Sequence, residues 1–332
     1  MIVALASSGE LARVLDAFWR GSLGTSSAFF SGTLVRAIPL TVVGVGIAIA
    51  FRAGVFNIGG EGQLLLGAVA ATVIGLQSPN GLGAGGVALA LLASALAGAA
   101  WAAIAAVLRA RFGVFEVIST IMLNFIAADL VSYLVRGPLQ EPTHVYPQTE
   151  LIATSARLPR FWPETRLHVG ILIAAVVGIG VSWFLKRSAA GFRIRSVGAS
   201  VSAARVAGRV NVERVSAAVL IASGAFAGLA GGIEVTGVTY ALYENISPGY
   251  GFSAIAVAVL ARLNPLGVFA TALLFATLET GALGMQRDAG IPSVVASVIE
   301  AVVILIVVAA SGDAFRLPVR KLLLGKTSEA VA

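Results

Sequence analysis

The sequence contains no cysteine, only two histidines and few charged residues for its length. Without cysteine the chain has neither disulfide bonds nor thiolate chemistry. Charged residues make up 12% of the 332 residues and hydrophobic residues 58%, whereas soluble domains carry roughly 25% charged residues. The mean hydropathy is +0.94. This composition excludes a soluble globule and predicts a chain embedded in a lipid bilayer.

No pattern of an enzyme or a metal site is present in the sequence. His144 and His168 are 24 residues apart, unlike the short spacing of paired metal ligands, and we expect both to lie at the surface. Gly325-Lys326-Thr327 resembles the end of a phosphate-binding loop, but that motif requires glycine where this chain has Arg320. We therefore expect no catalytic residues, no metal and no cofactor in this chain.

Long apolar runs predict an all-α fold, a polytopic bundle of about 8 to 10 transmembrane segments that forms one integral membrane domain over 1–332. A β-barrel would instead show short segments of alternating polarity. The segment 249–262 is too short to cross as a helix, and Asn264-Pro265 follows it, so 249–281 is predicted to be a broken or hairpin element. The apolar segments lie near 34–51, 58–76, 86–108, 114–135, 168–185, 215–236, 249–262, 265–281 and 291–310.

Basic residues predict the orientation of these segments. The 186–214 connection carries seven Lys and Arg residues against one acid, Glu213, which by the positive-inside rule places it in the cytoplasm. Alternation along the chain then puts the loop 136–167 outside and the C-terminus in the cytoplasm. The net charge of +7 is assigned to orientation, not to nucleic-acid binding. In 1–33 we expect neither a span nor a signal peptide, because charged residues interrupt the apolar sequence.

Polar residues inside apolar segments are the candidates for a solute pathway, because a charge at the centre of a membrane helix costs about 2.5 to 3.5 kcal/mol. Asn57, Glu61 and Gln63 lie in a glycine-rich stretch at the start of a span. We expect irregular backbone there, lining the pathway or its inner gate. The alternative is that Asn57 caps the helix and that Glu61 is favoured in its first turn by the helix dipole.

Four further acids or amides are pathway candidates. Glu116 and Asn124 are eight residues apart, so they lie on nearly one helix face and should point into the bundle. Asn124 could bind a solute, but a hydrogen bond between helices is the simpler role. Glu234 and Glu300 are also intramembrane acids, and either could instead be paired structurally.

Gly224, Gly228 and Gly232 form two consecutive GxxxG patterns on an uncharged segment. Such patterns give a helix a flat face for close packing against another helix. The spacing leaves open whether that helix belongs to the same chain or to a second subunit.

Four stretches together resemble the permease subunits of nucleoside ABC importers, within the wider group that also handles branched-chain amino acids and simple sugars. They are FRAGVFNIGGEGQ from Phe51 to Gln63, EVISTIMLN from Glu116 to Asn124, GFRIRSVGASVSAARVAG from Gly191 to Gly208, and SPGYGF from Ser247 to Phe252, which is followed by IAVAVLARLNPLG. The resemblance runs from about Thr33 to the last apolar segment.

This resemblance implies a permease subunit of an ATP-driven importer in the bacterial cytoplasmic membrane, translocating nucleosides or related small polar solutes. Permeases of the same type for simple sugars or branched-chain amino acids, and an ion-coupled secondary transporter, are the alternatives. The implied partners are a separate ATP-binding subunit, a second permease subunit in a homo- or heterodimer, an external solute-binding protein and the lipid bilayer, with no nucleic acid.

The resemblance also implies that 186–214 contains a coupling helix, near 202–208, that docks into the ATP-binding subunit. Small side chains let such a helix seat in a groove, and arginines can pair with acids of the partner. Without the resemblance, an ordinary basic loop is the simpler interpretation. The residues assigned to coupling are Gly191, Arg193, Arg195, Ala203, Ala204, Arg205 and Gly208.

Overall fold

The structure is a computed structural model that describes residues 10–78, 84–206 and 210–292 and the single positions 294, 298, 301 and 302. Over these residues the chain is helical, with two isolated β-bridges and no strand. It divides into two compact units, Ser22–Thr277 and a second that combines the chain up to Gly21 with the chain from Leu278. The all-α prediction is confirmed, and six described helices are long and apolar enough to cross a bilayer: Ala28–Arg52, Gly85–Phe112, Glu116–Arg136, Gly170–Arg187, Val212–Thr239 and Pro265–Ala289.

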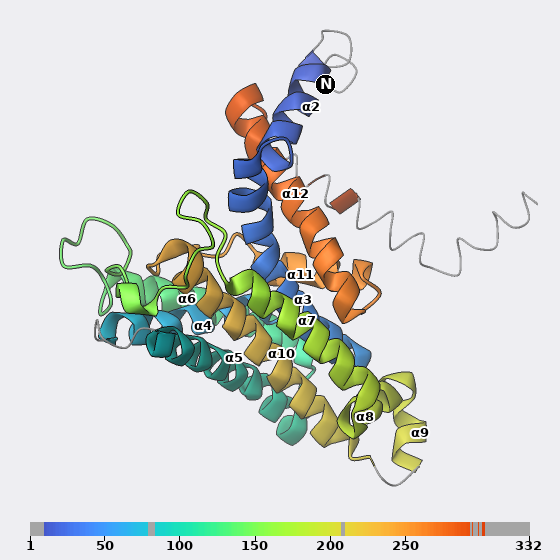
Figure 1. Ribbon diagram of the computed structural model, residues 1–332. Helices are drawn as coiled ribbons and strands as arrows, with labels where there is room; N and C mark the ends of the chain where they lie inside the picture. The colour runs from blue at the N-terminus through green and yellow to red at the C-terminus, as the bar shows by residue number, and fades with distance from the viewer. Residues whose placement is uncertain are drawn as a thin grey trace, which may run out of the picture. The chain divides into compact units, whose positions relative to one another are not determined.

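The larger unit is built around α3 (Leu34–Arg52), α4 (Gly60–Gln77) and α10 (Val212–Glu234). A π-helical turn, η1 (Ala28–Thr33), precedes α3, and another, η3 (Val235–Thr239), follows α10. α10 packs against α3, α4 and α5 (Ala84–Phe112), and α4 also packs against α6 (Glu116–Arg136) (Figure 1). α3 is buried along most of its length, because its small and β-branched apolar residues let neighbours approach from every side.

The glycines of α10 make its contact with α5 close. A Cβ at Gly228 would lie 2.2 Å from the Ser94 carbonyl oxygen, and one at Gly224 would lie 2.5 Å from that of Gly98. A Cβ at Gly232 would lie 2.1 Å from the Ser94 hydroxyl oxygen. Only residues without a Cβ permit this approach. The helix that these glycines meet therefore belongs to the same chain.

The predicted broken element consists of α11 (Tyr250–Leu260) and α12 (Pro265–Ala289). The 11 residues of α11 span about 16 Å, roughly half of a hydrocarbon core of about 30 Å. At the break, Arg262 and Leu263 have φ values of 51° and 57°, and Pro265 starts α12, where its missing N–H is not needed. Arg52 of α3 donates a hydrogen bond from Nε to the Leu263 carbonyl oxygen at 2.7 Å.

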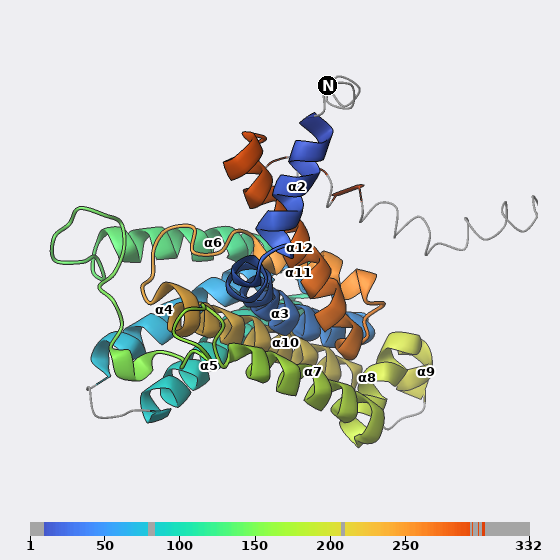
Figure 2. The same cartoon turned by 45° about the horizontal axis from the view of Figure 1, so that its top comes forward.

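Two short helices, α8 (Ala189–Ala199) and α9 (Val201–Val206), follow α7 (Gly170–Arg187). They lie at the opposite end of the larger unit from the 137–169 connection, which contains the turn η2 (Thr154–Ala156) (Figures 1 and 2). The sequence predicted one short helix near 202–208. α8 was missed, although Ser188 caps it by accepting a hydrogen bond from the Gly191 N–H at 2.9 Å.

The smaller unit contains α2 (Glu10–Ser22) up to Gly21 and the last turns of α12. They touch through glycine, since a Cβ at Gly21 would lie 2.6 Å from the Gly284 Cα. α2 was not predicted, because charged residues interrupt its apolar sequence, and at 13 residues it is short for a span. The predicted segment 291–310 falls largely outside the described residues.

Candidate functional site

The connection between α3 and α4, residues 53–59, is the irregular backbone that the glycine-rich sequence predicted. Asn57 is fully buried there. Its Nδ2 donates to Gln63 Oε1 at 2.8 Å and to Ser223 Oγ at 2.9 Å. Its Oδ1 accepts from the Gly59 N–H at 2.9 Å and from Gln63 Nε2 at 3.0 Å. These four bonds use the full capacity of the amide, so Asn57 fixes the shape of the connection.

Asn57 is not the cap of α4, as one alternative had it. Gly59 precedes the first helical residue, Gly60, and no side chain caps this helix. Asn57 instead stabilises the turn before the helix, through the Gly59 N–H. Glu61 does lie in the first turn of α4, where a carboxylate is favoured by the helix dipole.

One face of α6 holds the connection in place. Glu116 Oε1 accepts from the Phe56 N–H at 3.4 Å, and Thr120 Oγ1 from the Ile58 N–H at 3.3 Å. Asn124 Oδ1 accepts from the Gly62 N–H at 2.8 Å, and its Nδ2 donates to the Ile58 carbonyl at 2.9 Å. The spacing of four residues aligns the three side chains. Asn124 thus joins two elements of the protein, the role that its position in the sequence favoured.

Glu61 links the first turns of two helices. Its Oε2 accepts from the Gly251 N–H of α11 at 2.7 Å, and its carboxylate also bonds to the Ser247 side chain. A Cβ at Gly251 would lie 2.1 Å from the Glu61 nitrogen, so the two backbones are in contact.

A polar pocket of about 290 Å³ opens beside Glu61. It is formed by α4, α6 and the connection between η3 and α11, and it is lined by Glu61, Leu65, Ala128, Asp129, Val131, Ser132, Glu244, Asn245 and Ser247. Its volume is close to the lower end of small-molecule sites, roughly 300 Å³. With three carboxylates, the pocket is suited to accept hydrogen bonds from hydroxyl and N–H groups.

The three carboxylates of the pocket are held differently. Arg136 binds Glu244 through two hydrogen bonds, with Nη2 to Oε2 at 2.8 Å, and Ser132 donates to the same carboxylate. These bonds lower the pKa of Glu244 to about 2. Asp129 is exposed and makes no hydrogen bond or ion pair within the described part of the chain. It is the carboxylate of the pocket that remains available to a solute.

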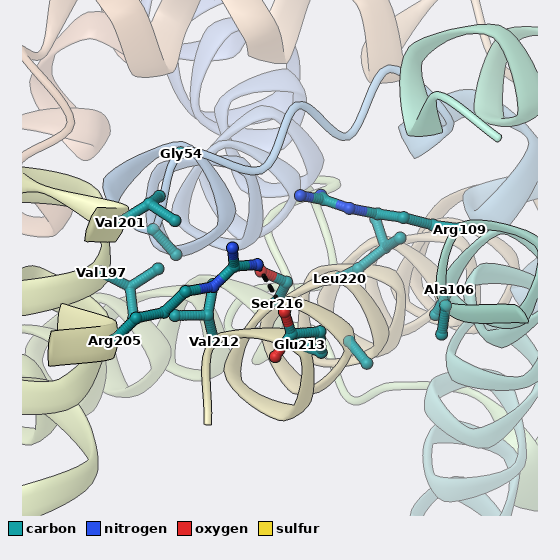
Figure 3. Close-up of a pocket in the computed structure, with 13 residues that line it drawn as sticks. Gly54, Ala106, Arg109, Val197, Val201, Arg205, Val212, Glu213, Ser216 and Leu220 are labelled. Atoms are coloured by element: carbon teal, nitrogen blue, oxygen red, sulfur yellow. Dashed lines mark hydrogen bonds and ion pairs between the residues drawn. The ribbon is translucent and has the colours of Figure 1, made fainter. Parts of the chain in front are cut away.

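A second pocket, of about 220 Å³, lies where α8 and α9 meet the ends of α3, α5 and α10 (Figure 3). The side chains of Arg109 and Arg205 reach into it from opposite sides (Figure 3). Arg205 is paired with Glu213 at 2.6 Å, and Arg109 is paired with Glu116 at 2.8 Å. Through Glu116, this pocket is connected to the 53–59 backbone.

The residues assigned to coupling take different positions. Gly191 lies in the first turn of α8, where a Cβ would lie 2.4 Å from the Phe184 carbonyl oxygen of α7. Ala204 is buried against Val197 and Val212. The remaining described residues of the set are at least partly exposed: Arg193, Arg195, Ala203 and Arg205. Gly208 lies outside the described residues.

The prediction that His168 lies at the surface is wrong. Its side chain is fully buried, and Nδ1 accepts from the Gly170 N–H at 3.1 Å. Burial, with Arg160 and Arg166 nearby, lowers the pKa of His168 to about 4. The burial depends on Gly237, where a Cβ would lie 2.5 Å from the ring, and this residue is too distant in sequence for the contact to be predicted. His144 is exposed, as expected.

Residues 29–308 match the family described as the permease component of the branched-chain amino acid transport system. The chain belongs to this permease family. It is therefore a multi-pass membrane protein and a transport component. This membership removes the ion-coupled secondary transporter that the sequence had left as an alternative.

Three relatives illustrate the range of this permease family. The permease is 38% identical to the guanosine ABC transporter permease protein NupP of Bacillus subtilis, over 97% of this chain and 92% of the relative. It is 36% identical to a glucose ABC transporter permease protein of Haloferax volcanii, over 86% of this chain and 77% of the relative. It is 31% identical to the nucleoside ABC transporter permease protein NupB of Lactococcus lactis, over 82% of this chain and 77% of the relative. No solved structure matches the permease.

The structure brings some of the predicted pathway residues of this permease together and separates others. Asn57, Gln63, Glu116 and Asn124 surround the 53–59 backbone, and Glu61 joins it to the polar pocket. Glu234 is buried at the end of α10, with Coulombic attraction from Arg36 and Arg166, and does not line that pocket. Glu300 lies outside the described residues.

Thr120, Ser132 and Glu244 were missed by reasoning from the sequence. Thr120 carried a usable signal, because it lies midway between Glu116 and Asn124 at a spacing of four. Ser132 lies two turns beyond Asn124 on nearly the same face. Glu244 carried no usable sequence signal, because it lies in a connection whose path depends on contacts with α6.

Proposed function

We propose that this permease is the membrane-spanning subunit of an ATP-driven importer of nucleosides in the bacterial cytoplasmic membrane. The observation that carries the proposal is its similarity to a guanosine permease over 97% of the chain. The similarity to a nucleoside permease of Lactococcus lactis supports it. A simple sugar is the second candidate solute, because a glucose permease is 36% identical over 86% of the chain.

The polar pocket is the proposed solute site. Nucleosides present ribose hydroxyls and base N–H groups, which donate hydrogen bonds to carboxylates. Glu61 and Glu244 are already bonded within the protein, and their charges shape the pocket. Asp129 is free to accept a hydrogen bond from the solute and is the residue to which we assign that role.

The exposed face of α6 supports the proposal that a second permease subunit, in a homo- or heterodimer, lies across a shared pathway. Asp129 lies on this face with four large residues that are 51 to 66% exposed, Met122, Phe125, Ile126 and Tyr133. A carboxylate facing lipid at membrane depth is costly. A partner subunit and a water-filled pathway remove that cost, because the carboxylate then meets water and the apolar side chains meet protein.

The α8 and α9 region is the proposed docking site of the ATP-binding subunit, which would bind and hydrolyse the nucleotide. Arg195 of α8 is partly exposed, and an acid of the partner would pair with its guanidinium group. Ala203 and Arg205 of α9 are exposed. On this assignment α8, α9 and the C-terminus are cytoplasmic, and the solute-binding protein approaches the opposite end, at 136–167 and 237–250.

Close contacts connect the proposed docking site to the proposed solute site, so a movement at one can reach the other. A Cβ at Gly198 of α8 would lie 1.8 Å from the Arg52 carbonyl oxygen. Arg52 is the last residue of α3, and the backbone that follows it leads through Asn57 to Glu61. A shift of α8 would therefore reach the solute pocket as a rigid-body displacement of packed elements.

Reconstituted transport tests the proposal. The permease, its ATP-binding subunit and its solute-binding protein are assembled in liposomes, and uptake of labelled guanosine and glucose is measured. We expect ATP-dependent uptake of guanosine that vanadate inhibits and a protonophore does not. Asp129→Asn should lower uptake severalfold while the complex still assembles. Asp16→Asn, which removes an exposed carboxylate outside the pocket and outside both proposed docking faces, is the matched control. Equal uptake by both variants would remove Asp129 from the solute site, and uptake of glucose alone would reassign the solute.

A further inference from the structure

A large apolar groove runs along the outside of α7 and α10, away from the polar pocket. It has a volume of about 600 Å³, within the range of roughly 300 to 1,000 Å³ for small-molecule sites. Its walls are apolar over most of their length, with Val181, Phe184, Ala218, Ala222 and Phe226 among the lining residues. A surface of this kind favours hydrocarbon.

The groove has a basic end. Arg193 of α8 and Arg214 of α10 are its only charged lining residues, and no acid lines it in the part of the chain that the structure describes. Both are exposed, and neither side chain makes a described ion pair, whereas Arg205, Arg109 and Arg136 each bind an acid of the chain. Two guanidinium groups without internal acids at one end of a groove can bind a phosphate diester through charge-assisted hydrogen bonds.

The length of the groove matches one leaflet of a bilayer. Along α10, Arg214 and Phe226 are twelve residues apart, which corresponds to about 18 Å. Half of a hydrocarbon core of about 30 Å is about 15 Å. A phosphate at the two arginines would therefore place an acyl chain along the whole apolar part of the groove.

From this match of charge, polarity and length, we infer that the groove binds one anionic glycerophospholipid, with its phosphate between Arg193 and Arg214 and an acyl chain along α7 and α10. The lipid comes from the leaflet that α8 meets, which in the orientation proposed above is the cytoplasmic one. Arg193 then serves lipid binding and not the docking of the ATP-binding subunit. The inference concerns lipid retention, so it stands or fails independently of the transported solute.

Lipid retention by the purified full-length permease in detergent tests this site. Phosphatidylglycerol or phosphatidylcholine is added, and bound lipid is counted by native mass spectrometry. Wild-type protein should retain phosphatidylglycerol over phosphatidylcholine by roughly tenfold or more, since each arginine at an anionic headgroup contributes separately. The Arg193→Gln/Arg214→Gln variant should lose this preference. The Lys186→Gln/Arg187→Gln variant removes the same charge from exposed residues at the end of α7 that do not line the groove, and it should keep the preference. Equal retention by the two variants would overturn the site.

A second measurement identifies the occupant. The chain has no cysteine, so Ala222→Cys provides a single labelling position in the groove wall. Brominated phosphatidylglycerol should quench a fluorophore at this position more strongly than brominated phosphatidylcholine does, and Arg193→Gln/Arg214→Gln should remove the difference. Equal quenching by the two lipids would overturn the proposal. So would cross-linking of this position to another copy of the permease or to a partner protein, because the groove would then be a protein interface.

Discussion

Replacing Gly228 by alanine should destabilise the bundle, although alanine is the better helix former. The added Cβ would lie 2.2 Å from the Ser94 carbonyl oxygen and 2.8 Å from the Gly98 Cα, whereas ordinary contacts begin near 3.4 Å. Both neighbours are backbone atoms, so α5 must move away from α10 by about 1 Å. A gap of up to about 1 Å forfeits a quarter to a half of the dispersion energy at each contact. Overpacking of this kind costs about 1 to 3 kcal/mol.

Gly180→Ala is the matched control for this substitution. Gly180 also lies inside a helix, α7, but no atom lies within 4 Å of its added Cβ. Helix propensity then favours alanine by up to about 1 kcal/mol. Thermal unfolding of the purified permease in one detergent, with size exclusion to exclude aggregates, compares the two. We expect a lower midpoint for Gly228→Ala and an unchanged or higher one for Gly180→Ala. Equal midpoints would refute the packing argument.

Three further changes probe the connection, the buried histidine and the docking helix. Asn124→Leu leaves the Gly62 N–H and the Ile58 carbonyl without partners, so it should lower the free energy of unfolding by about 2 kcal/mol or more; exposed Met122→Leu on the same helix should not, and equal effects would contradict this role. The folded pKa of His168 is below its unfolded value, so the unfolded state takes up the proton first, and the free energy of unfolding should fall as the pH drops from 6.5 to 4, by about 2 kcal/mol at pH 5. His168→Asn, which keeps an acceptor for the Gly170 N–H, should reduce the loss of thermal stability between pH 7.5 and 5, and an unchanged loss would exclude His168 as its source. Ala203→Asp should block co-purification of the ATP-binding subunit with the thermal midpoint unchanged, whereas Ala204→Asp should lower that midpoint because it buries a charge; retained co-purification by Ala203→Asp would move the docking site elsewhere.

The long helices could be predicted from the sequence because hydropathy over about 20 residues depends on local composition alone. The break before Pro265 was predictable for the same reason, since proline removes a backbone donor wherever it occurs. α8 was not predicted, because its arginines and small residues are as typical of a basic loop as of a surface helix. Its cap, Ser188, was the local signal that could have indicated it.

The candidate site could be predicted only in part. Helical periodicity placed Glu116 and Asn124 on one face, and their partners are indeed the backbone beside Asn57. Periodicity does not indicate which distant connection folds onto that face, so the pairing of Arg136 with Glu244 was not foreseen. His168 was expected to be exposed because it is polar and lies near a loop. Gly170 and Gly237, which have no side chains, enclose its ring instead.

Arg52 links α8 to two parts of the proposed pathway. Its carbonyl is in contact with α8, and its side chain holds the break between α11 and α12 at Leu263. On the docking proposed above, a movement of α8 would therefore displace the 53–59 connection and the break between α11 and α12 together. Because Arg52 contacts both α8 and the break at Leu263, these two parts of the proposed pathway cannot move independently of each other.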